Sequence, residues 1–480
     1  MDSKVIYDIF YLLAAILFIL GVKLMGHPRT ARRGNMFGVL GMTIAIVISI
    51  MKANDIMKVN DIMKANEALV SLQPFTLFVI GLCCMIGIFF GAILATRVKM
   101  TEMPQLVAVF NGIGGLASVL VAGAALVVAT DLFVDEKIAT ALSGFIGSIT
   151  FIGSAVAAGK LQELNFFKKG FPLPTFLRHI LNLALVCGCG WASYSLLNAS
   201  SDQAVLLYIA ICGFGFVLGY TLTAPIGGAD MPVVIALLNS YSGIAASATG
   251  FVVGSNILII AGSLVGASGI ILTSLMCVAM NRSLLSVLFG GGKVGVDVDA
   301  DEVYATVKRT TADDVAMMAD MAERVVVVPG YGMAVAQAQN AVSDMADILE
   351  ARGVTVEYAI HPVAGRMPGH MNVLLAEADV DYEQLKELEE INPTFETVDL
   401  AIVLGANDVV NPEARKEGTV ISGMPILDVD KAQQVVIIKR SLGPGYAGIP
   451  NPLFAQDNAS MLFGDGREMI QEIITSLKEL

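Results

Sequence analysis

The sequence predicts an α-helical polytopic membrane domain of about nine spans, followed by an α/β domain with a doubly wound parallel sheet. Two observations lead to this prediction. Roughly the first 280 residues are almost continuously apolar, and charged residues make up only 15% of the chain, against about 25% in soluble proteins. From about residue 295, short apolar runs alternate with amphipathic segments, as in parallel sheets. We therefore expect a membrane domain at 1–282, a linker at 283–294 and a soluble domain at 295–480.

Nine apolar stretches are each able to cross about 30 Å of hydrocarbon, although the second is short. The first has the length of a full span rather than of a signal peptide, and no small-residue cleavage site follows it. We place the spans near 5–25, 36–51, 75–95, 105–130, 138–158, 178–198, 203–223, 232–252 and 256–280.

Basic residues concentrate in alternate loops between these spans. The even loops are neutral or acidic, so the positive-inside rule puts the odd loops in the cytoplasm. The N-terminus is then outside, and the C-terminal domain is cytoplasmic. The basic residues are Arg29, Arg32 and Arg33 in the first loop, Arg97 and Lys99 in the third, Lys160, Lys168 and Lys169 in the fifth, and Arg282 after the last span.

Composition argues against two classes of function. A net charge of −13 is unfavourable for binding nucleic acid. The six cysteines all lie in apolar runs, where structural disulfides are not expected, and they show no metal-ligand spacing. We interpret them as packing residues and predict no metal site.

The second loop contains a six-residue motif repeated three times over residues 51–68. Three copies are too short for a solenoid, which requires repeats of about 20 residues or more. We interpret this segment as a duplicated external loop that can form a helix.

Three polar residues stand out in the membrane domain, because polar groups in lipid usually face the bundle interior or a pathway. Asp230 introduces the eighth span, and Asn239 follows about 13 Å deeper at helical rise. Asn111 is the other amide in the middle of a span. Together they could hold a water chain that passes protons. The alternative is hydrogen bonding between helices without any role in transport.

The soluble domain contains five strand-like runs, at 325–329, 354–359, 400–405, 435–438 and 460–463. Amphipathic helices fit the ranges 333–352, 382–390 and 467–479. This alternation predicts a Rossmann-like doubly wound sheet, whose ligand should lie at the carboxyl ends of the strands.

A glycine-rich turn joins the first strand to a helix. Gly330 permits the tight turn, and Gly332 allows the backbone to approach a pyrophosphate. Val335 stands in place of the usual third glycine, where we expect it to pack the helix on the sheet. The strand before and the helix after this turn favour a dinucleotide site.

The ribose end of the site has two candidate signals. Glu357 lies inside the second strand rather than at its end, so we do not assign it to a ribose. Lys439, Arg440 and Ser441 follow the fourth run and could hold a 2′-phosphate by charge-assisted hydrogen bonds. The alternative is an exposed basic edge.

Further candidates lie in loops at the predicted carboxyl edge. Arg366 could contact phosphates, and Asp408 could hydrogen-bond or titrate near a nicotinamide, so we propose both as catalytic residues. The flexible segment 443–448 suits a lid. We also assign Asp465, after the last run, to the site. No nucleophile set is apparent, and hydride exchange needs none because the cofactor carries the chemistry.

At this point the chain resembles the beta subunits of proton-translocating NAD(P) transhydrogenases along essentially its whole length. The segments that carry the resemblance are GGADMP at 227–232, LNSYSG at 238–243, PGYGMAVAQAQ at 329–339, HPVAGRMPGHMNVLLA at 361–376, GANDVVNP at 405–412, Lys439–Ser441 and GYAG at 445–448.

The resemblance implies Re/Si-specific hydride transfer from NADH to NADP+, coupled to inward proton flow across a bacterial inner (plasma) membrane. The soluble domain would bind NADP(H) in a flipped orientation, and a separate alpha subunit would bind NAD(H), in a heterotetramer of two alpha and two beta subunits. Lys439, Arg440 and Ser441 match the family's 2′-phosphate site. Asp408, Asp230 and Asn239 match residues tied to coupling. Contacts around the pyrophosphate, the nicotinamide and the lid match Tyr331, Val363, Ala364, Gly365, Arg366, Met367, Pro368, Gly405, Ala406, Asn407, Asp408, Gly445 and Tyr446.

The chain departs from some bacterial relatives, which carry a membrane histidine where this chain has Asn111. His27 and His179 lie near span ends, and no histidine lies in the middle of a span. A path through this chain alone would lack a side chain whose pKa is near neutrality. Other members of the family place that histidine on a different helix, outside this chain, and the resemblance to them leads us to predict that the alpha subunit contributes the proton-relay histidine.

Two other hypotheses about the function remain open. A nucleotide-gated ion channel or transporter would use the soluble domain only for sensing, and its signature would be ion flux without hydride transfer. A membrane-anchored NADPH-dependent reductase would need a substrate pocket, and nine spans are excessive for an anchor. A Lys-Arg-Ser cluster that selects NADP over NAD argues against the first hypothesis.

Overall fold

The computed structural model describes residues 3–25, 28–63, 73–98, 102–128, 132–162, 164, 167, 173–227, 230–289, 304, 306–367, 369–419, 421–445 and 447–480. Contacts divide the chain into two compact units. One comprises Met1–Ala224 and Leu237–Ile270, and the other Pro225–Ala236 and Ile271–Leu480. The domain boundaries at 282 and 295 stay predictions; a short helix, α12 (Leu284–Phe289), lies within the expected linker.

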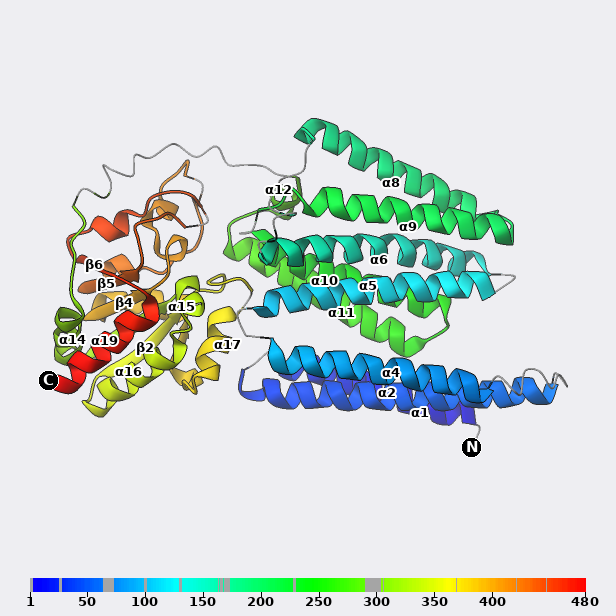
Figure 1. Ribbon diagram of the computed structural model, residues 1–480, viewed down its shortest axis with the longest axis horizontal. Coiled ribbons are helices and arrows are strands. Elements are labelled where there is room, and N and C mark those ends of the chain that lie inside the picture. The colour runs from blue at the N-terminus through cyan, green and yellow to red at the C-terminus, as the bar shows by residue number, and fades with distance from the viewer. Residues whose placement is uncertain are drawn as a thin grey trace. The chain divides into compact units, whose positions relative to one another are not determined.

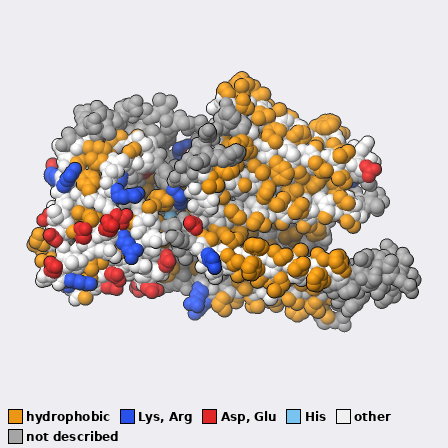
Figure 2. Space-filling view, in the orientation of Figure 1, with side chains coloured by type: hydrophobic (Ala, Val, Ile, Leu, Met, Phe, Trp, Pro, Cys, Tyr) orange, Lys and Arg blue, Asp and Glu red, His pale blue; other side chains and the backbone are white. Residues whose placement is uncertain are grey.

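Within the described ranges, nine helices are long and apolar enough to cross a membrane, as the sequence predicts. Hydrophobic side chains cover their surfaces, whereas Lys, Arg, Asp and Glu gather on the sheet-containing part (Figure 2). Exposed apolar surface of this extent requires lipid or partner helices. The helices are α1 (Ser3–Met25), α2 (Pro28–Met63), α4 (Gln73–Arg97), α5 (Met103–Val128), α6 (Val134–Leu161), α8 (Thr175–Leu197), α9 (Ser201–Thr223), α10 (Met231–Val252) and α11 (Asn256–Ala279) (Figure 1).

The second helix is longer than the predicted span at 36–51. It begins at Pro28, so the arginines expected in the first loop lie in its first turns. Proline suits this position because the first helical residues need no N–H donor. The same helix continues through residues 51–63 of the repeat, which are helical as expected; residues 64–68 lie outside the described part.

The soluble part is built on a six-stranded sheet with order β3-β2-β1-β4-β5-β6, in which every pairing is parallel. The chain reverses its direction across the sheet between β1 and β4, and such switch points hold ligands at the carboxyl ends of the strands. The five predicted strands are confirmed to within about a residue. The strands are β1 (Arg324–Pro329), β2 (Thr355–Ile360), β3 (Leu385–Glu387), β4 (Leu400–Leu404), β5 (Gln434–Lys439) and β6 (Ala459–Phe463).

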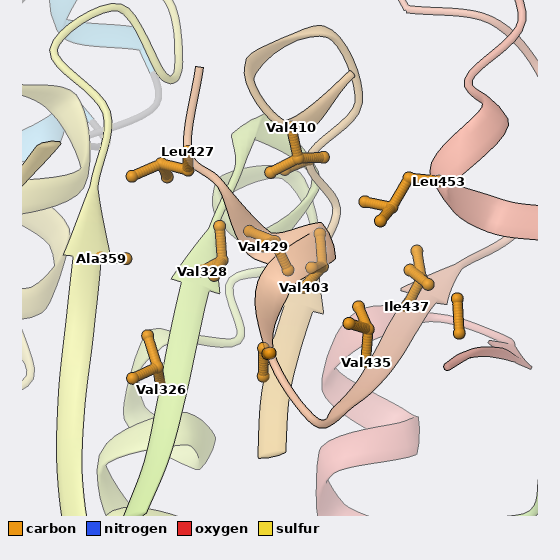
Figure 3. Packing of buried hydrophobic residues seen from close by; sticks show 14 of the residues in the cluster. Val326, Val328, Ala359, Val403, Val410, Leu427, Val429, Val435, Ile437 and Leu453 are labelled. Atoms are coloured by element: carbon orange, nitrogen blue, oxygen red, sulfur yellow. The ribbon is translucent and has the colours of Figure 1, made fainter. Parts of the chain in front are cut away.

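Alternate strand residues pack one face of the sheet into a core. Figure 3 shows Val326 and Val328 of β1 with Val403 of β4 and Val435 and Ile437 of β5 on this face. This alternation is the period-two pattern of a strand. Short helical segments cover the core: α18 (Leu388–Ile391), η4 (Asn392–Thr397), η5 (Asp408–Val410), η7 (Val429–Lys431) and η8 (Pro452–Ala455). A separate small cluster includes Ala414 of η6 (Pro412–Arg415).

Two predicted helices were wrong in part. The range 333–352 is two helices, α15 (Tyr331–Ala336) and α16 (Gln339–Ala351), because Gln337 is left-handed with φ 50° and ends the first. The range 382–390 contains η3 (Tyr382–Gln384) and then β3, which pairs with β2, so edge pairing overrides the helical pattern. The helix predicted at 467–479 is confirmed as α19 (Gly466–Glu479). The sequence reading missed α14 (Ala312–Met321) and α17 (His370–Glu377).

Candidate functional site

A cavity lies at the carboxyl ends of β1, β4 and β5, where the fold predicts a ligand. Its lining includes all the predicted cofactor-binding residues that the structure describes. Pro368 and Tyr446 lie outside the described residues. The predicted residues in the lining are Gly330, Tyr331, Gly332, Val335, Val363, Ala364, Gly365, Arg366, Met367, Gly405, Ala406, Asn407, Asp408, Lys439, Arg440, Ser441, Gly445 and Asp465.

Three glycines allow the loops after β1 and β4 to cross. The Gly332 N–H donates to the Gly405 carbonyl at 2.9 Å. A Cβ on Gly330 would lie 2.4 Å from the Ala406 backbone, and one on Gly405 would lie 2.4 Å from the Gly332 Cα. Gly405 also has φ +66°, a conformation that favours glycine. The glycine motif therefore serves loop packing in addition to any approach of a phosphate.

The packing role predicted for Val335 is wrong. Its side chain is 47% exposed and lines the cavity, whereas the neighbouring Met333 and Ala334 are fully buried. Met333 and Ala334 form the buried side of α15, and Val335 lies on the side that lines the cavity.

Two buried histidines hold the loop that contains Arg366. His361 Nδ1 accepts from the Val363 N–H at 3.2 Å, so its Nε2 carries the proton and donates to the Pro425 carbonyl at 2.8 Å. Burial lowers the pKa of His361 to about 4, and the ring stays neutral. His370 Nδ1 accepts from the Arg366 N–H at 3.2 Å. The sequence reading gave neither histidine a role, although their places at both ends of a Gly/Pro loop were a usable signal.

The Arg366 guanidinium lies over the Tyr331 ring, 4.5 Å from its centroid. A cation placed over an aromatic face is stabilised by the ring quadrupole. This contact joins the loop after β2 to the turn after β1. Arg366 also lines the cavity, and its planar guanidinium is a group whose geometry suits a phosphate or carboxamide.

Asp408 ties the lid segment to the end of β4. Its Oδ2 accepts from the Ala447 N–H at 3.0 Å, and a Cβ on Gly445 would lie 2.5 Å from its Oδ1. Asn407 Nδ2 donates to the Gly443 carbonyl at 3.3 Å. Gly443 and Ala447 therefore contact the two residues, Asn407 and Asp408, that were predicted to contact the ligand.

Lys439 ends β5, and Arg440 and Ser441 follow it into the same cavity. Lys439 Nζ donates to the Gly443 carbonyl at 2.8 Å and lies 5.0 Å from the centroid of the Phe454 ring. Burial lowers its pKa to about 8, and the nearby Asp408 carboxylate partly opposes this shift. Arg440 and Ser441 are exposed, so their donors can reach a ligand.

Other residues near the site have structural partners or were missed. Glu357 pairs with Arg324, 2.5 Å between Oε2 and Nη2, which agrees with leaving it out of the ribose site. Asp465 caps α19 by accepting from the Arg467 N–H at 3.0 Å. Ile421 and Met424 add apolar lining that no sequence motif indicated.

The polar residues of the membrane spans lie in two places. Asp230 forms an ion pair with Arg282, 3.3 Å between Oδ2 and Nη2, where α10 begins and α11 has ended. Asn111 is buried on α5, and Asn239 is half-buried on α10.

Contacts between α5 and α10 place Asn111 and Asn239 at a similar depth. Gly114 faces Ser242, and the Ser118 carbonyl accepts from Thr249 Oγ1 at 3.5 Å, so the two helices run in the same direction. Asn111 precedes Gly114, and Asn239 precedes Ser242, by three residues, about 4.5 Å of helix. A proton path through both amides stays a prediction.

Comparison with known proteins gives one consistent result. The family model for the NAD(P) transhydrogenase beta subunit matches residues 7–476. Two relatives from Rhodospirillum rubrum, each named NAD(P) transhydrogenase subunit beta, are 45% identical to this chain over 479 residues, which covers 97% of the chain and 98% of each relative. The chain belongs to this family.

The family match confirms the resemblance that the sequence motifs indicated. The chain is an oxidoreductase subunit of a family that uses nicotinamide nucleotides, and a beta subunit implies an alpha partner. With nine long apolar helices in the part that the structure describes, it is a multi-pass membrane protein.

Proposed function

We propose that this chain binds NADP(H) in its soluble domain and receives hydride there from NADH held by an alpha subunit, while protons move inward across the membrane. One observation carries the proposal: the glycine turn, the Arg366 loop, the end of β4 and the Lys439–Ser441 cluster converge on one cavity. These four segments are far apart in sequence.

The residues of the cavity fit a phosphorylated dinucleotide. Lys439, Arg440 and Ser441 offer two cations and a hydroxyl to a 2′-phosphate, which selects NADP over NAD. Arg366 and the crossed glycine loops would hold the pyrophosphate, and Asn407 with Asp408 would orient the nicotinamide amide. When bound, the nicotinamide supplies the hydride chemistry; this chain positions it and excludes water.

Coupling is proposed to work through the lid. The Asp408 carboxylate accepts the Ala447 N–H, so protonation of Asp408 would weaken the contact that closes segment 443–447. Two states with different nucleotide affinity are what linkage to proton occupancy requires. In this proposal Asn111, Asp230 and Asn239 lie on the proton route.

The remaining parts of the proposal concern assembly and location. The chain would sit in the bacterial inner membrane, with its N-terminus outside and the nucleotide domain in the cytoplasm, within a heterotetramer of two alpha and two beta subunits. The alpha subunit would bind NAD(H) and supply the relay histidine. The alternation of basic loops supports the proposed orientation of the chain in the membrane. An alpha subunit without a histidine in its spans would refute the relay assignment.

The proposal is tested first by nucleotide selectivity. We expect the purified full chain, in detergent, to bind NADPH at least about 100-fold more tightly than NADH, because two cations lack a phosphate partner with NADH. Titration calorimetry with each nucleotide measures both affinities. Equal affinities would contradict the assignment of the Lys439–Ser441 cluster.

A further inference from the structure

Residues 306–311, where the chain enters the soluble domain, run along the outer edge of β6. The Met461 N–H donates to the Lys308 carbonyl at 2.8 Å, and the Thr310 N–H donates to the Met461 carbonyl at 3.0 Å. Thr306 Oγ1 donates to the Ala455 carbonyl at 3.2 Å. Arg309 pairs with Met461 as a parallel bridge. These bonds fix the place of this segment, and Tyr304 lies just before it in the sequence.

Tyr304 contacts the loop after the lid in two ways. Its ring stacks on Phe454, with centroids 6.2 Å apart and planes 14° apart. Its hydroxyl oxygen accepts the Asn451 N–H at 2.9 Å. The ring also packs against the core cluster that contains Leu453 and Phe454. Tyr304 therefore packs against the loop 449–455 and supports its position.

Asn451 passes this support to the cavity. It is fully buried, and its Nδ2 donates to both oxygens of Asn407, at 3.0 Å to the carbonyl and 3.2 Å to Oδ1. Its own Oδ1 accepts from the Leu453 N–H at 3.0 Å. Asn407 in turn donates to the Gly443 carbonyl, and Asn407 and Gly443 both line the cavity.

The stacked rings reach the cavity by a second route. Phe454 stacks on Tyr304, and Lys439 Nζ lies over the Phe454 ring, 5.0 Å from its centroid. Lys439 Nζ also donates to Gly443, the residue that Asn407 contacts. Both routes from Tyr304 thus end at the same lid residue.

We propose that Tyr304 and Asn451 are positioning residues for the nucleotide site: they hold Asn407, Lys439 and Gly443 in the arrangement that binds NADP(H), and they touch no part of the ligand themselves. Neither residue lines the cavity. This inference rests on the proposed binding of NADP(H). According to this inference, Tyr304, which lies where the chain enters the soluble domain, affects the affinity of the nucleotide site.

Loss of the Tyr304 hydroxyl leaves the Asn451 N–H without its acceptor in the arrangement seen here. When the loop 449–455 is open, the Asn451 N–H can donate to water instead. Loss of the Tyr304 hydroxyl therefore destabilises mainly the closed arrangement, in which this N–H has no other acceptor. The binding-competent fraction drops, and the apparent Kd rises by that factor. We expect a rise of about five- to tenfold for NADPH.

The test uses the full chain in detergent and the fluorescence of bound NADPH. Tyr304→Phe keeps the stacked ring and removes only the acceptor. Asn451→Asp keeps the acceptor for Leu453 and removes the donors to Asn407. The matched control is Tyr358→Phe, which removes a hydroxyl from a ring buried on β2, in the other half of the sheet. Thermal unfolding of each variant is measured in parallel.

We expect both test variants to bind NADPH at least about fivefold more weakly, with Tyr358→Phe within about twofold of the parent chain. Parental affinity in folded Tyr304→Phe and Asn451→Asp would overturn the inference. Equal weakening in Tyr358→Phe would also overturn it, since the effect would then follow general stability. If Tyr304→Phe does not fold, Asn451→Asp decides alone. A parent chain that does not bind NADPH would instead refute the proposed function.

Discussion

Replacing Lys439 and Arg440 together with alanine is expected to weaken NADPH binding by about 100-fold or more. Each cation would lose a charge-assisted bond to the 2′-phosphate, worth about 1.5–3 kcal/mol, and each 1.4 kcal/mol is about tenfold in affinity. Both residues line the cavity at the end of β5. Titration calorimetry with NADPH measures the loss.

The matched control is Lys478→Ala, which removes a cation from the exposed last turn of α19. It should leave the NADPH affinity unchanged, and neither variant should change the weak affinity for NADH. An unchanged NADPH affinity in the double variant would leave Lys439–Ser441 as an exposed basic edge, the alternative that the sequence left open.

The same titration has an expected pH dependence. Burial lowers the pKa of Lys439 to about 8, with Asp408 opposing the shift. Lys439 is therefore mostly charged at pH 7 and mostly neutral at pH 9, so the Kd for NADPH should rise as pH passes through about 8. The Lys439→Ala variant should not show this rise in Kd.

The same shift in pKa has the opposite effect on the stability of the folded chain. Between about pH 8 and pH 10.5 the unfolded chain binds more protons than the folded chain, so the free energy of unfolding increases with pH in this range.

Gly405→Ala is expected to abolish measurable NADPH binding and to destabilise the soluble domain by about 3 kcal/mol or more. The added Cβ would lie 2.4 Å from the Gly332 Cα, and backbone cannot move aside as a side chain can. The crossed loops would have to separate, which dismantles the cavity at its centre. A φ of +66° adds about 1–2 kcal/mol of backbone strain.

Gly353→Ala separates the two causes. Gly353 also has a left-handed φ, +91°, but an added Cβ there meets no atom within 4 Å. This variant should show only the backbone strain, about 1–2 kcal/mol, and should keep the parental NADPH affinity. If Gly405→Ala behaves like Gly353→Ala in both measurements, the crossing of the loops is not essential to the site.

The sequence predicted the parts of the fold that have a strong local pattern of apolar residues. Val325–Val328 and the runs at β4 and β5 are continuous apolar segments bounded by turns, so their strands were found to within about a residue. The edge strand β3 was not, because Leu385–Glu387 becomes a strand only through pairing with β2. The break at Gln337 has no proline or glycine to announce it.

The site was predictable where chemistry and turn geometry coincide in one segment. The glycine turn, Arg366, Asp408 and the Lys439 cluster all line the cavity. Tyr304 and Asn451, which support these segments, were not found because they act through contacts between distant loops. Val335 was misjudged because Met333 and Ala334 take the buried side of α15, and the sequence does not show which side of that helix packs on the sheet.

We propose that this chain couples hydride transfer to proton movement. The most direct measurement uses inside-out vesicles that hold the chain co-expressed with its alpha subunit, so that the nucleotide domain faces the medium. NADH and NADP+ are supplied, and NADPH formation is followed with an NADPH-specific coupled assay. We predict that an acid vesicle interior accelerates NADPH formation and that a protonophore abolishes the acceleration. Tight NADPH binding with no hydride transfer, with the alpha subunit present, would contradict the account and favour a nucleotide-sensing channel or transporter.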